Sequence, residues 1–83
     1  MLRVYLIIAP AMPCNKLVVW CVVNALQSMD GVWAVMTQCN DCRSEFQMIV
    51  QDDGYNYPLD YVKRRIKGLR VIPLKPEQER WNQ

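Results

Sequence analysis

Residues that interrupt regular structure divide the 83-residue chain into six short segments, and this division limits the folds open to it. Proline fixes one backbone angle and lacks an N–H, while glycine adopts turns that other residues avoid. The interruptions are Pro10 with Pro13, Asp30 with Gly31, the stretch CNDCRS at 39–44, DDGYNYP at 52–58, and Gly68. The sequence therefore predicts one small domain of six short elements.

The first segment, residues 2–9, alternates in the manner of a β-strand. Its even positions, Leu2, Val4, Leu6 and Ile8, form one strongly apolar face. We expect this face to pack on the core, which leaves Arg3, Tyr5 and Ile7 on the open side of a sheet. The apolar run from Val4 to Ala9 is short for a signal peptide, so we interpret it as a strand rather than an export signal.

The second segment, residues 14–29, is rich in β-branched residues, so a strand competes with a helix. At about 100° per residue, however, its polar side chains fall within a single arc. The polar arc holds Lys16, Asn24, Gln27 and Ser28, and the opposite arc holds Val18, Val19, Val22, Ala25, Leu26 and Met29. The spacing predicts a helix, with Asn15 as a candidate N-cap and Gly31 closing its end.

The remaining segments predict strands at 32–38, 45–51 and 69–74, with a helix that Pro58 opens and Gly68 closes. Phe46, Met48 and Val50 mark the inner face of the third strand, and Leu59, Val62 and Ile66 mark the inner face of the second helix. Residues 1–74 form a single α+β domain on this interpretation, and residues 75–83 form a polar C-terminal tail.

The order strand, helix, strand, strand, helix, strand resembles the split βαβ arrangement of the ferredoxin-like superfold over residues 2–74. That resemblance implies a four-stranded antiparallel sheet with two helices on one face. It implies no activity, because superfolds carry many unrelated functions.

The composition argues against an enzyme. The chain has no histidine to serve as a base for Ser28, Thr37 or Ser44, and three glycines are too few for a glycine-rich phosphate loop. Asp52 and Asp53 are adjacent, so in an extended chain they point to opposite sides. We predict no catalytic residue and no cofactor.

Cysteines give the strongest hint of a metal. Cys39 and Cys42 are spaced as in a zinc knuckle, and the exit of the first strand would bring Cys14 to the same end of the sheet. Structural zinc needs four ligands, and Cys21 lies about 10 Å along the helix from Cys14, too far to converge easily. Asp41 could also serve as a fourth ligand, but a polar hairpin tip built on Asn40 and Asp41 is the favoured interpretation, with a zinc-stabilised mini-domain as an alternative.

A basic cluster in and after the second helix offers another alternative, a nucleic-acid-binding module. Its residues are Lys63, Arg64, Arg65, Lys67 and Arg70. The third strand presents Glu45, Gln47 and Ile49 where an RNA-binding sheet would present aromatic rings, and the net charge is only +2. A solvated helix face explains the cluster more simply.

Trp20 is the most informative residue, because it falls inside the polar arc of the first helix. An exposed indole either meets the chain's own tail, through Trp81, or a protein partner. The predicted partner surface contains Trp20, Lys16, Asn24, Tyr55, Tyr57 and Trp81.

We therefore expect a small, non-catalytic, cytoplasmic interaction protein that regulates or inhibits a larger protein, as small phage-encoded inhibitors do. No membrane segment is expected, because no apolar run approaches 20 residues. Exposed sheet edges, together with Ile7 and Ile49 on the open face, also allow a homodimer.

Overall fold

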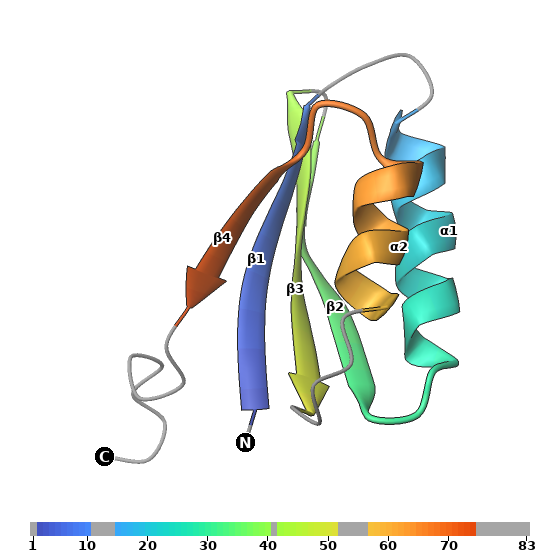
Figure 1. Ribbon diagram of the computed structural model, residues 1–83. Coiled ribbons are helices and arrows are strands. Elements are labelled where there is room, and N and C mark those ends of the chain that lie inside the picture. Colours follow the sequence, from blue (N-terminus) through green and yellow to red (C-terminus); the bar gives the residue numbers. More distant parts are fainter. Residues whose placement is uncertain (1, 11–14, 41, 52–56, 75–83) are drawn as a thin grey trace.

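The protein is represented by a computed structural model, and the structure describes residues 2–10, 15–40, 42–51 and 57–74. Six elements follow one another: β1 (Leu2–Pro10), α1 (Asn15–Gln27), β2 (Val32–Cys39), β3 (Arg43–Gln51), α2 (Tyr57–Arg65) and β4 (Arg70–Leu74). The strands form one sheet in the order β2-β3-β1-β4, and every neighbouring pair is antiparallel. Both helices cover the same face of this sheet (Figure 1). The predicted α+β class, antiparallel four-stranded sheet and two helices are confirmed.

The core lies between the helices and the covered face of the sheet. Phe46 and Met48 from β3 are fully buried, as the alternation of that strand predicts. The predicted apolar arc of α1 is also confirmed, because Val19 and Leu26 are buried and Val18 packs against the core. The buried cluster contains Ile7, Ala9, Val19, Val22, Val23, Leu26, Val32, Ala34, Phe46, Met48, Val50, Val62 and Ile66.

The predicted facing of β1 is wrong. Ile7 is 0% exposed and pairs with Phe46, so the odd positions of β1 point toward the helices. Tyr5, paired with Met48, packs against the same core. Both faces of β1 carry large apolar side chains, so alternation alone chose the wrong one; its pairing with β3 decides the question. The even positions 2, 4, 6 and 8 thus lie on the face away from the helices.

The turns take the shapes that their residues favour. Gly31 and Gly68 have φ values of 76° and 73°, which only glycine adopts at low cost. A β-bulge interrupts the pairing of β2 with β3 at Thr37, whose hydroxyl donates a hydrogen bond of 3.1 Å to the carbonyl of Glu45. Within the described ranges, neither helix is long and apolar enough to cross a membrane.

Candidate interaction surfaces

The outer side of α1 carries an apolar stripe that faces away from the core. We call Leu17, Trp20, Cys21 and Asn24 the α1 stripe; they recur at spacing three and four, so they share one side of the helix. Leu17 is 73% exposed and Trp20 is 45% exposed. Large apolar side chains that are exposed to water in this way are typical of a surface that binds a protein or another ligand.

Several residues predicted for partner binding lie here or nearby. Lys16, Trp20 and Asn24 are all exposed on α1. Tyr57 does not lie in a loop; it is the first residue of α2, 41% exposed, with its ring 6.1 Å from that of Tyr61. Tyr55 and Trp81 lie outside the described residues.

A second apolar surface covers the sheet face opposite the helices. Strand register places side chains on this face in rows of four, one from each strand. The two central rows are Trp33, Ile49, Val4 and Leu74, then Val35, Gln47, Leu6 and Ile72. We call these eight residues the sheet grid. Seven are apolar: Trp33 and Val35 are exposed, four others are partly exposed, and Val4 is buried at 2% exposure.

Trp33 and Val35 dominate the sheet grid, because each is 55% exposed. Neither residue was predicted from the sequence as part of a binding surface, and Leu17 was not predicted either. The sequence held a signal for each of them. Leu17 lies opposite the buried arc of α1, and Trp33 and Val35 alternate with the buried Val32 and Ala34. The mistaken facing of β1 concealed the extent of the grid, since it placed the even positions of that strand in the core.

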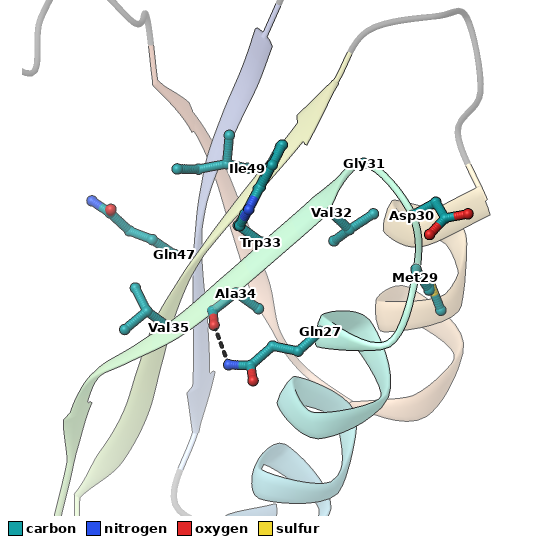
Figure 2. A pocket seen from close by; sticks show the side chains of 10 residues that line it. All are labelled: Gln27, Met29, Asp30, Gly31, Val32, Trp33, Ala34, Val35, Gln47 and Ile49. Carbon is teal, nitrogen blue, oxygen red and sulfur yellow. Dashed lines mark hydrogen bonds between the residues drawn. The ribbon is translucent and has the colours of Figure 1, made fainter.

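At the outer edge of β2 the surface forms an open groove of about 530 Å³. Figure 2 shows Trp33, Val35 and Gln47 on one side of β2 and Gln27 on the other, toward α1. The amide nitrogen of Gln27 donates a hydrogen bond of 2.5 Å to the carbonyl of Ala34. This bond occupies an outward-facing carbonyl of the edge strand, so part of β2 is unavailable for pairing with another strand.

Charged residues border the sheet grid at one end. The next row along the sheet contains Gln38, Glu45, Ile8 and Arg70. A carboxylate oxygen of Glu45, whose side chain is only 12% exposed, lies 2.6 Å from Nε of Arg43, close but without the alignment of a hydrogen bond. The sheet face thus has an apolar centre and a charged margin.

The five predicted nucleic-acid contacts do not form one surface. Lys63, Arg64 and Arg65 are exposed on α2, whereas Arg70 pairs with Ile8 on the opposite side of the molecule. The guanidinium carbon of Arg65 lies 4.9 Å from the ring centre of Tyr61, a cation–π contact. Lys63 and Lys67 border a shallow hollow of about 520 Å³ beside β4. The cations are spread over several directions, which dilutes their attraction for a phosphate backbone.

The cysteine loop is organised by Asn40. Its side-chain oxygen accepts hydrogen bonds from the backbone N–H groups of Cys42, at 2.7 Å, and Arg43, at 3.0 Å. The sulfur of Cys39 lies 3.5 Å from the hydroxyl of Ser44. Cys14 and Asp41 lie outside the described residues, and the described ones include no group of three side chains placed to hold a metal.

Comparison with known proteins gives no functional guide, because the chain matches no protein-family model, no curated protein and no solved structure. The geometry itself offers two apolar surfaces on opposite sides of the molecule, the α1 stripe and the sheet grid. Both suit protein contact, in which apolar side chains are removed from water.

Proposed function

We propose that this chain is a small, non-catalytic protein that binds a larger protein through the α1 stripe and regulates or inhibits it by occupying its surface. The observation that carries the proposal is the exposure of Leu17 and Trp20, 73% and 45%, three residues apart on the side of α1 that faces away from the core. Tryptophan is enriched among the residues that dominate binding energy.

The stripe also indicates the chemistry of its partner. Two large apolar side chains at helical spacing fit an apolar groove, as amphipathic helices do when they dock. Lys16 is the only charged residue of α1, and it borders the stripe. The partner is therefore a protein with an apolar groove that has carboxylates at its margin.

The ferredoxin-like split βαβ arrangement belongs to this proposal. The order of the six elements supports it, as does the central position of β1 between β3 and β4. In this arrangement the helices and the open sheet face point in opposite directions, so a partner on α1 leaves the sheet free.

Affinity capture from the native host tests the proposal. The immobilised wild-type chain is expected to retain one protein at both low and moderate salt, and Leu17→Ser and Trp20→Ala are each expected to release it. Arg64→Ala is the matched control, because it changes another exposed helical residue away from the stripe. The retained protein, once identified and purified, is then titrated with each variant, and losses of more than about tenfold are expected for the two stripe variants.

Nucleic-acid binding is the competing function, and the same experiment separates it. Retention of nucleic acid that falls steeply with salt, and that Arg64→Ala with Arg65→Ala removes, contradicts the proposal. Equal retention of the partner by wild type and both stripe variants contradicts it as well.

A further inference from the structure

We propose that the sheet grid binds a second copy of this chain, so that two protomers pack sheet against sheet around a two-fold axis that runs along the strands. This inference uses a different surface from the α1 stripe and stands independently of it. It starts from the eight residues of the grid, of which only Gln47 is polar.

Part of the apolar surface of the sheet grid lies uncovered, around Val4, which is itself only 2% exposed. Trp33 and Val35 are each 55% exposed, and Leu2, in the next row of the same face, is 44% exposed. Residues 75–83 include one large apolar side chain, Trp81, among mainly polar and charged ones. The identical grid of a second copy matches the sheet grid in both size and character.

The sheet grid also fits a second copy of itself when the two are related by this two-fold axis. The axis places β2 of one copy over β4 of the other, and β3 over β1. Val35 of one copy then faces Ile72 of the other, and Trp33 faces Leu74. The two most exposed side chains of the grid therefore meet apolar residues. Gln47 flanks the axis, and its amide both donates and accepts, so the two glutamines can bond reciprocally.

The charged residues at the margin of the sheet grid also fit a symmetric pair. Within one copy, Glu45 and Arg70 lie in the same row with Ile8 between them. The two-fold axis places Arg70 of the second copy beside Glu45 of the first. The sideways offset between them is one strand spacing, about 4.8 Å. Glu45 already forms an ion pair with Arg43 of its own copy at 2.6 Å, so Arg70 of the second copy adds a further cation beside it, which suits a closed symmetric pair.

The area agrees with a weak dimer. Four strands about 4.8 Å apart span about 19 Å, and the three complete rows at about 6.8 Å span about 20 Å, so the described face offers about 400 Å². Two such faces bury about 800 Å², which lies in the range of weak, transient interfaces. We expect a dissociation constant of about 10–100 µM, the range of transient complexes. Both α1 stripes point outward from this dimer, so it presents two partner surfaces on opposite sides.

Sedimentation velocity from about 1 to 500 µM, a range that brackets the expected affinity, tests the dimer. The wild-type mass is expected to rise from 9.8 kDa toward twice that value. Val35→Lys is expected to keep the chain at 9.8 kDa at every concentration. Leu17→Lys is the matched control, since it places the same charge on an even more exposed aliphatic residue of the opposite side, and it should dimerise as wild type does.

Cross-linking tests the orientation. In a background with the four cysteines changed to serine, Val35→Cys and Ile72→Cys chains are mixed and treated with a bis-maleimide that spans about 10 Å, the spacing of facing sheets. The mixture is expected to give a covalent dimer. Either variant alone is expected to give little, because its copies are about 17 Å apart across the axis.

A wild-type mass that stays at 9.8 kDa throughout overturns the proposal. So does a dimer that Leu17→Lys breaks and Val35→Lys leaves intact, or cross-linking of Val35→Cys chains to one another in preference to the mixed pair. Partner capture is unaffected by these outcomes, so failure of the dimer and failure of the proposed function are distinguishable.

Discussion

Two leucines of α1 allow a direct comparison of the core with the exposed stripe. Leu26 is 0% exposed and Leu17 is 73% exposed, although both belong to the same helix. Replacing each in turn with alanine removes the same atoms and keeps a good helix former in place. Any difference in stability then reports the surroundings of the two side chains.

The structure sets the size of the expected difference. Fully burying a leucine side chain is worth about 1.5–3 kcal/mol. Leu17 is shielded over 100 − 73 = 27% of its surface, so its truncation should cost about 0.4–0.8 kcal/mol. Leu26→Ala leaves a cavity in the core and should cost about 2–5 kcal/mol. The whole 83-residue domain is expected to have only about 4–12 kcal/mol of stability, so the second loss is severe.

Urea unfolding followed by far-ultraviolet circular dichroism measures both losses, at low micromolar concentration so that self-association does not contribute. Leu17→Ala should also release the captured partner while it keeps its fold. A loss for Leu17→Ala as large as that for Leu26→Ala refutes the reasoning, because it shows that the chain itself covers the stripe.

Three further substitutions test the fold that presents these surfaces. Gly68→Ala forces a positive φ of 73° on alanine and places its Cβ 3.3 Å from the ring of Pro10. We therefore expect the free energy of unfolding in urea to fall by about 1–2 kcal/mol. An unchanged free energy of unfolding contradicts the turn geometry. Asn40→Ala removes the acceptor for the N–H of Cys42 and should cost about 1 kcal/mol, with faster amide hydrogen exchange in the hairpin tip; unchanged exchange contradicts that role. Phe46→Ala should cost about 3–5 kcal/mol and lower the urea midpoint by the corresponding amount, and a transition near that of wild type excludes Phe46 from the core.

The elements were predictable because their signals are local. Breakers such as Gly31 and Gly68 stand where turns occur, and the polar arc of α1 excluded a strand despite its many β-branched residues. The alternation of β3 correctly identified Phe46 as a core residue. Each of these signals depends on neighbours within one or two turns of the chain.

The facing of β1 was not predictable in the same way. Its two sets of alternating positions both carry large apolar side chains, and the choice between them depends on pairing with β3, far along the sequence. That error hid most of the sheet grid. Trp20 was identified because it interrupts a polar arc, whereas Trp33 was missed because a tryptophan in a strand gives no sign of which face it occupies.

The central claim is that the α1 stripe binds a protein partner, and photo-cross-linking from within the stripe tests it most directly. Cys21 is an exposed free thiol in the stripe, so a chain that retains only this cysteine can carry a benzophenone maleimide. A matched chain that retains only Cys42 places the same probe on the hairpin tip. On irradiation in host extract, the Cys21 probe is expected to give one cross-linked protein. Adding Leu17→Ser should abolish this product, and the Cys42 probe should not form it. The same products from both probes, unchanged by Leu17→Ser, would contradict the account.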